Sequence, residues 1–387
     1  MAISVGTDSE SVLTSSSLER RRSPLPRVLQ VALSLAVVAF VFRGVLPHVT
    51  GYSAAWTSIK GVGWLALMGL VAVTGLHVSL YWPQIMASLP GLTLAQAAVS
   101  NQTSTTVANT VPGGGVVAVG VSYTMYRAWG FTDAEIALST GVTFVWNIFA
   151  KLALPVVALI ALAVAGRAGG GMLVASSAGI GLLGGAIAVL ALMLWKQDVA
   201  RRVGVAFGVV LGAWRRLARR PRATNWGEVG MRFRSDTIGL VSAKWPALTV
   251  TTLASNMALY LVLLIALRAV GVSGEVLTWT QVLGIFSLVR LISAFPITPG
   301  GVGLVELGYI GGLVLAAGGQ PGVPAGELRA EIAAAVLIFR ALTYVVPIPL
   351  GALTYVVWQR KRSWRVTKPA TIDASGAAPT LLEQPAS

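Results

Sequence analysis

Residues Ser100–Gly115 read "SNQTSTTVANTVPGGG" and lie inside a long apolar part of the chain. Nine of the eleven residues from Ser100 to Thr110 are polar, and a proline and three glycines follow shortly after. At membrane depth such a segment is tolerated only where protein or a water-filled cavity covers it. We therefore expect a helical hairpin that enters the membrane, breaks near Pro112 and leaves on the same side.

The composition is that of an integral membrane protein. Of the 387 residues, 55% are hydrophobic and 11% are charged, against about 25% charged in soluble domains. Three uncharged runs each have the roughly 20 residues that a helix needs to cross hydrocarbon; they are Gly61–Trp82, Gly171–Trp195 and Trp245–Leu267. The chain has no cysteine and two histidines, which excludes disulfides and predicts neither a metal site nor a cofactor.

The positive charge is concentrated in three blocks. Four of the 29 Lys and Arg residues lie in residues 1–27, eleven in 196–244 and five in 359–387. Basic residues gather in cytoplasmic segments next to membrane spans, so the charge indicates topology and not a nucleic-acid partner. We expect a disordered basic cytoplasmic tail at 1–27, a basic cytoplasmic loop at 196–244 and a disordered cytoplasmic tail at 359–387.

Counting the crossings gives an all-α fold with about six full spans and two re-entrant hairpins, eight span-like segments in all. The expected full spans are Val28–Leu46, Gly61–Trp82, Leu138–Ala165, Gly171–Trp195, Trp245–Leu267 and Ile332–Trp358. The expected hairpins are Leu94–Trp129, entering from the cytoplasm, and Val276–Leu315, entering from outside with its tip near Pro299. This order places both chain ends in the cytoplasm.

Within the membrane domain, residues 28–358, the pattern of span, hairpin and span occurs twice. The first copy covers residues 61–165 and the second 245–358, and they start from opposite sides of the membrane. The breaks carry similar sequences, "TVPGGGVVAVG" and "ITPGGVGLVEL". Inverted repeats with broken helices at matching positions are typical of transporters that bind their substrate at the repeat interface. The alternative is that Gly and Pro serve only to pack membrane helices closely.

Each break can open a half-helix with its positive end uncovered, because proline suits a first helical turn and glycine leaves the N–H groups approachable. Such an end attracts anions, here a phosphate or a carboxylate. We expect the two tips to meet near the middle of the bilayer. The predicted headgroup-binding residues at the breaks are Pro112, Gly113, Gly114, Pro299, Gly300, Gly301 and Gly303, together with the polar face of the first hairpin, Asn101, Gln102, Thr105 and Asn109.

Charged residues within the apolar segments are further candidates, because a charge in hydrocarbon is costly unless it is paired or hydrated. Arg290 and Glu306 lie eight residues before and after Thr298, so in antiparallel arms they are expected to face each other, either binding a headgroup or forming a purely structural pair. Lys151 and Arg340 lie in the spans after the two hairpins, facing a cavity or snorkelling to an interface.

The segments that carry these features resemble the membrane region of the lysylphosphatidylglycerol synthases, a flippase-like family. They are "NTVPGGG", "YRAWGFTDAEIALSTGVTFVWNIFAKLALP", "AFPITPGGVGLVELGYIGGLVL" and "AAAVLIFRALTYVVPIPLG". The resemblance covers about residues 28–358 and is strongest at "TPGGVGLVE". It implies a translocator that moves a phospholipid or related lipid between leaflets, and by motif position it points to Pro299, Gly300, Gly301, Gly303, Glu306, Arg290 and Arg340. Only 29 residues follow Trp358, so no soluble aminoacyl-transfer domain is expected and no synthase activity is carried over.

The function expected from the sequence is therefore a lipid flippase of the bacterial cytoplasmic membrane and not an enzyme. Its substrate would be an anionic phospholipid or a polyprenyl-linked lipid, and a separate lipid-synthesising enzyme is a possible partner. One alternative is a non-catalytic accessory subunit of an envelope lipid or glycan pathway. Another, less favoured, is an intramembrane lipid-modifying enzyme, for which no constellation of nucleophile and general base is visible in the sequence.

The topology is testable with reporter tags. Tags at Asp8, Arg215 and Ser375 should report the cytoplasm, and tags at Gly169 and Gly322 should report the outside, because the basic blocks fix the orientation. A cytoplasmic signal at Gly169 would break the alternation of crossings and the inverted repeat with it.

Overall fold

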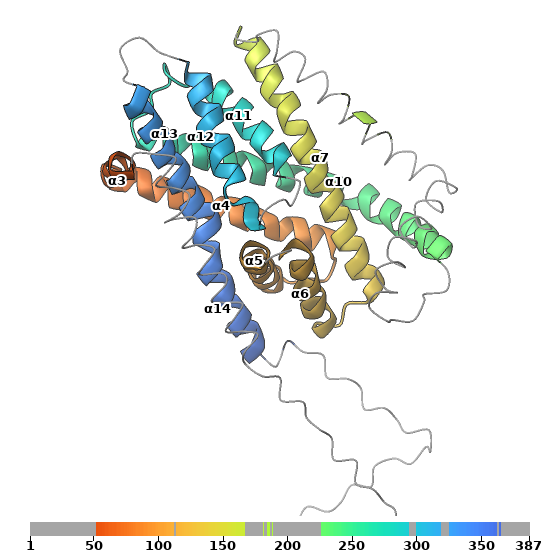
Figure 1. Cartoon of the computed structure of the whole chain (residues 1–387). Coiled ribbons are helices and arrows are strands. Elements are labelled where there is room, and N and C mark those ends of the chain that lie inside the picture. The colour runs from red at the N-terminus through yellow and green to blue at the C-terminus, as the bar shows by residue number, and fades with distance from the viewer. Residues whose placement is uncertain are drawn as a thin grey trace, which may run out of the picture.

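The structure, a computed structural model, describes residues 52–111, 114–166, 181, 184–185, 188, 226–293, 299–318, 325–361 and 364, and this part of the chain is helical (Figure 1). The predicted first span, nearly all of the predicted span Gly171–Trp195 and both predicted tails apart from the stretch up to residue 361 and Trp364 lie outside it. The same holds for Pro112 and Gly113.

The helices follow one another with short connections. They are α3 (Tyr52–Lys60), α4 (Trp64–Ser88), α5 (Leu94–Thr110), α6 (Gly114–Ala128), α7 (Asp133–Val164), α10 (Trp226–Ala269), α11 (Trp279–Ile292), the short turn η2 (Pro299–Gly301), α12 (Leu304–Ala317), α13 (Ala325–Arg340), the π-helical segment η3 (Ala341–Val345) and α14 (Pro347–Arg360).

Four helical stretches within the described residues are long and apolar enough to cross a membrane. They are Trp64–Ser88, Asp133–Val164, Arg234–Ala269 and Gly326–Arg360. Each contains or overlaps a predicted span, so the expectation of an all-helical membrane protein is confirmed. The total number of spans and their direction stay predictions.

The predicted boundary at residue 245 is wrong for secondary structure. α10 begins at Trp226, inside the predicted basic loop. Hydropathy marks where a helix becomes apolar and not where its hydrogen bonding begins, because polar residues also extend a helix into the aqueous phase. The loop expected at 196–244 therefore ends in helix.

Both predicted hairpins are pairs of short helices separated by a break. α5 packs against α6, and α11 packs against α12 (Figure 1). At the open end of the second pair, the Gln281 side-chain amide donates to the carbonyl of Ala316 at 3.1 Å, which joins the start of α11 to the end of α12. How deep either pair lies in a bilayer stays a prediction.

The first arms of the two hairpins begin with the same capping structure. Thr93 caps α5 and Gln96 bonds back to it, and Thr278 and Gln281 do the same at α11. Such a box satisfies N–H groups that a helix start otherwise leaves without partners. The hairpins thus share an initiation signal in addition to their glycine-rich breaks.

The two halves pack through reciprocal contacts. α4 lies along α10, α5 packs against α14, and α11 packs against α7. Exchanging α4, α5 and α7 with α10, α11 and α13–α14 leaves this pattern unchanged. The contacts therefore support an internal twofold arrangement in which the first arm of each hairpin is covered by the last helix of the other half.

The last predicted span is not one regular helix. After α13 the chain forms the π-helical segment η3, in which Val346 N donates to Ala341 O at 2.9 Å. Pro347 follows and has no N–H to continue the regular ladder. A π-helical turn at this point absorbs the missing bond and changes the direction in which the following side chains point.

The packing of α14 on α5 is tight at Gly351, and this gives a stability prediction. A Cβ atom there would collide with Thr106 Oγ1 and with the carbonyl oxygen of Gln102. Since a backbone carbonyl cannot move aside, we expect Gly351→Ala to lower the free energy of unfolding by roughly 1–3 kcal/mol.

The matched control is Gly75→Ala in α4, where a Cβ meets nothing within 4 Å. It should be neutral or stabilising by up to about 1 kcal/mol, because alanine favours helix. Thermal unfolding of the purified protein in detergent, followed by tryptophan fluorescence, measures both. Equal stability of the two variants would contradict the packing described here.

Candidate functional site

A cavity of about 560 Å³ lies between the two broken elements. Its wall is built from α4, α5, α7, α11, the η2 turn, α12, α13 and η3, so both halves of the chain contribute to it. The polar and charged side chains that line it are His77, Tyr81, Asn101, Gln102, Thr105, Asn109, Lys151, Arg290, Ser293, Tyr309, Arg340, Thr343 and Tyr344. A polar hollow enclosed by apolar helices is the usual form of a specific small-ligand site.

The polar face of α5 divides between two roles. Asn101, Thr105 and Asn109 recur at every fourth residue and line the cavity, as residues on one helix face do. Ser100 and Thr103 are instead buried against neighbours, where they bond to Tyr126 at 3.2 Å and to Thr354 at 3.0 Å. Of the polar run, the residues predicted for the headgroup path are those that reach the cavity.

The expected pairing of Arg290 with Glu306 is wrong. Glu306 is 6% exposed, and its Oε1 accepts from Arg340 Nε at 2.6 Å. The spacing argument measured both arms from Thr298, but α12 begins only at Leu304. Glu306 therefore sits in the first turn of α12, close to the break.

The same carboxylate changes the expectation for the second glycine-rich break. Glu306 Oε2 accepts from the backbone N–H of Gly303 at 2.7 Å, the residue just before α12. The positive end of this half-helix thus already faces an anion supplied by the protein, which the dipole favours. The prediction of an uncovered helix end does not hold here.

Arg340 holds the break from the other side. Its Nη2 donates to the carbonyl of Gly300 at 3.1 Å, and its guanidinium lies 4.4 Å from the centre of the Tyr344 ring. Tyr344 packs directly on Gly300, where φ is +60°, and a Cβ at that position would collide with the ring. Only glycine fits this combination of positive φ and close contact.

Tyr344 also joins the two broken elements. Its hydroxyl donates to the carbonyl of Asn109 near the end of α5 at 2.8 Å, while its ring covers Gly300 in η2. α5 and η2 are themselves in contact. The residues next to both breaks therefore come together, as expected, although Pro112 itself lies outside the described residues.

Gly114 has a packing role at the first break. A Cβ there would meet the carbonyl oxygens of Val107 at 2.6 Å and Ala108 at 2.5 Å. The glycine lets the start of α6 approach the end of α5, as small residues do between membrane helices. For this one of the predicted site residues, the alternative of close packing explains the residue type.

Arg290 and Lys151 complete the cavity. Arg290 Nη2 donates to Asn256 Oδ1 at 3.2 Å, while its buried Nε has no partner in the described part of the chain. Lys151 lies on α7 across the same cavity and interacts with Arg290 by charge repulsion. Neither is paired with a carboxylate among the described residues. Lys151 therefore faces the cavity, which was one of its two predicted positions.

Several lining residues were not predicted. His77, whose Nδ1 donates to the carbonyl of Ser255 at 2.8 Å, and Tyr81, one turn later, face the cavity from α4. His77 was considered only as a metal ligand, although an ionisable residue within an apolar span is itself a signal. Tyr344 carries no comparable signal, because its position depends on the π-helical segment.

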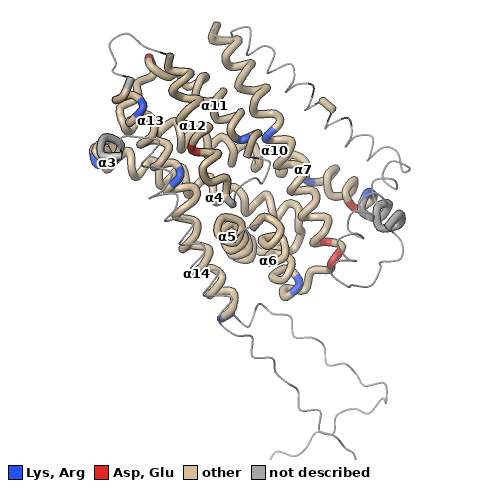
Figure 2. The backbone as a smooth tube through the Cα atoms, viewed as in Figure 1, with Lys and Arg blue, Asp and Glu red and all other residues tan. Residues whose placement is uncertain are grey.

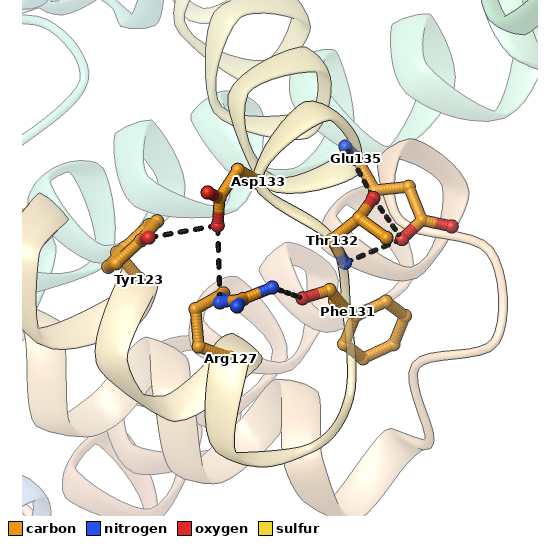
Figure 3. A network of polar contacts seen from close by, with 6 residues as sticks. All are labelled: Tyr123, Arg127, Phe131, Thr132, Asp133 and Glu135. Carbon is orange, nitrogen blue, oxygen red and sulfur yellow. Dashed lines mark hydrogen bonds and ion pairs between the residues drawn. The ribbon is translucent and has the colours of Figure 1, made fainter. Parts of the chain in front are cut away.

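Most charged side chains of the described residues lie away from the helix middles, with a few inside the bundle (Figure 2). A separate polar network lies at the junction of α6 and α7, where Arg127 pairs with Asp133 at 3.1 Å (Figure 3). Glu135 there bonds back to Thr132 and caps α7. These residues are exposed and stabilise the helix start, as expected from the sequence.

Comparison with known proteins gives one match. Residues 27–351 match a family model described as the lysylphosphatidylglycerol synthase TM region. No curated protein matches the chain at a significant level.

The ion pair at the second break gives a prediction with an internal control. Glu306→Gln and Arg340→Met should each destabilise the protein by roughly 3–5 kcal/mol, because either one leaves a buried charge alone. The double variant should be more stable than the two single changes would give by addition. For the exposed pair Arg127 and Asp133, with side chains 49% and 70% exposed, Arg127→Met, Asp133→Asn and their double variant should all lie within about 1 kcal/mol.

Thermal unfolding of the two sets in parallel measures the coupling. Additive effects at the buried pair, or equal coupling in both pairs, would show that Glu306 and Arg340 do not depend on each other.

Proposed function

Because the chain belongs to the lysylphosphatidylglycerol synthase TM family, which implies a role connected with membrane lipids, we propose that it moves a phosphate-bearing lipid between the leaflets of a membrane. In this proposal the headgroup enters the cavity while the acyl or prenyl chains stay in the surrounding lipid. The proposed activity breaks no covalent bond and uses no cofactor. The membrane is taken to be a bacterial cytoplasmic membrane, as expected from the sequence.

The observation that carries the proposal is the position of the cavity. It lies where the two broken elements meet, and its lining comes from both halves of an internally repeated chain. Binding sites of many transporters lie at the interface between repeats, on discontinuous helices. A headgroup at this point could be reached from either side by small movements of one half against the other.

The lining fits the headgroup of a lipid better than its chains. Asn101, Thr105 and Asn109 offer hydrogen bonds along one face of α5, and cations lie opposite. A cavity of this volume holds a small ligand, so the chains must remain outside. Such a division is what transfer of a polar headgroup through hydrocarbon requires, because an unsolvated polar group costs several kcal/mol in lipid.

Reconstitution tests the proposal. Purified protein is placed in liposomes that contain a trace of fluorescently labelled phosphatidylglycerol, and a membrane-impermeant quencher reports how much label reaches the outer leaflet. We expect exchange well above that of protein-free liposomes. We also expect the double variant Asn101→Leu, Asn109→Leu to slow exchange by about tenfold, since each lost hydrogen bond costs around 1 kcal/mol.

The matched control is Asn147→Leu. Asn147 is also an amide inside a long apolar helix, but it donates to Thr143 O of its own helix at 2.8 Å and does not line the cavity. Its variant should exchange lipid at the parent rate. A parent protein that does no better than empty liposomes would refute the proposed function, and equal loss in both variants would remove the cavity from it.

A further inference from the structure

The cations of the cavity are not equivalent. Arg340 is neutralised by Glu306 through a 2.6 Å ion pair and spends a further N–H on Gly300. It is therefore part of the framework that holds the second break. Lys151 and Arg290 line the cavity without a carboxylate partner among the described residues.

Arg290 is only partly satisfied. One Nη donates to the neutral amide of Asn256, and the buried Nε has no acceptor in the described part of the chain. A buried donor without an acceptor costs roughly 1–3 kcal/mol, and more for a charged group. The guanidinium thus keeps binding capacity for a ligand with oxygen acceptors.

Lys151 adds a second positive charge to the same space. It projects from α7, whereas Arg290 projects from α11, and the two helices pack against each other. The two charges repel each other, so the empty cavity stores an unfavourable interaction. An anion between them would turn this repulsion into attraction on both sides, and the fork of Arg with the point charge of Lys suits a phosphate group.

The cavity offers nothing comparable to a positively charged group. No carboxylate is among its lining residues, and the nearby Glu306 is committed to Arg340 and Gly303. The undescribed residues at the two breaks, 112–113 and 294–298, contain no charged side chain in the sequence. An ammonium group in this space would face Lys151 and Arg290 without a counter-charge.

From this charge balance we infer that Lys151 and Arg290 form the phosphate site and that they select lipids whose headgroup is purely anionic. Zwitterionic lipids and aminoacylated lipids are disfavoured. A phosphate monoester, which carries about −1.5 to −2 charges at neutral pH, is bound more tightly than a singly charged diester. The inference rests on the proposed function, since it names the substrate class of the same cavity.

Binding tests the inference without transport. Dioctanoyl phosphatidic acid, phosphatidylglycerol and phosphatidylethanolamine, and lysylphosphatidylglycerol with the same chains, are titrated into the purified protein while its thermal stability is followed. The apparent affinity should fall in the order given for the first two, and the lipids with an ammonium group should bind at least about tenfold more weakly than phosphatidylglycerol. A factor of ten corresponds to about 1.4 kcal/mol.

Glycerol 3-phosphate, which has the phosphate monoester and no acyl chains, separates a lipid site from a site for soluble phosphate esters. It should stabilise the protein far less than phosphatidic acid. Equal stabilisation would overturn the assignment to lipids, and equal affinity for phosphatidylglycerol and phosphatidylethanolamine would overturn the charge selectivity.

Variants connect the selectivity to its residues. Lys151→Met should reduce the preference for phosphatidic acid over phosphatidylethanolamine by about tenfold, Lys151→Arg should retain it, and Lys151→Glu should favour the ammonium lipids. The control is Lys60→Met, which removes a lysine of α3 that lies over Trp56 outside the cavity. An unchanged preference in Lys151→Met would exclude Lys151 from the phosphate site, and the parent series decides the question if a variant does not fold.

The same lipids in the liposome assay separate the two proposals. Selective binding with no exchange of any lipid would refute the proposed function and leave the phosphate site standing. Exchange of all lipids at equal rates, with no selective binding, would leave the function standing and refute the phosphate site.

Discussion

The contacts of Glu306 hold the region where the chain departs from regular helix. This carboxylate bonds to the N–H of Gly303 and to Arg340, and Arg340 in turn bonds to the carbonyl of Gly300. A break inside a membrane helix leaves backbone groups that lipid cannot satisfy. The ion pair supplies partners for two of them with charge-assisted bonds, and it ties α12 to the end of α13. The shape of the cavity follows, because Gly300 and Arg340 both line it.

The same arrangement separates holding the fold from binding a ligand. A charge that is fully paired inside the protein has little left to offer a substrate, whereas an unpaired one is costly until a ligand arrives. The structure keeps the first kind at the second break and the second kind on α7 and α11. Stability and selectivity can therefore be varied at different residues, which is unusual in a site of this size.

The sequence predicted the parts of this protein that depend on local composition. The polar run from Ser100, the glycine-rich breaks and the long apolar stretches each indicated their element, because solvation in lipid constrains every residue of a helix. The partner of Glu306 could not be predicted. It lies 34 residues further along the chain, and its direction depends on where α12 begins and on the π-helical segment after Arg340. Such contacts follow from tertiary packing and leave no periodic signal.

The reciprocal packing of the halves has a consequence for how such a chain could arise. Because the first arm of each hairpin is covered by the last helix of the other half, neither half can bury its own polar helix alone. Two copies of a half-length chain, inserted in opposite directions, would supply each other with the same covers. The fold is in this sense an antiparallel homodimer written into one polypeptide. Once the copies were joined, each was free to diverge, and one could keep its charges paired while the other contributed a lysine to a shared pocket.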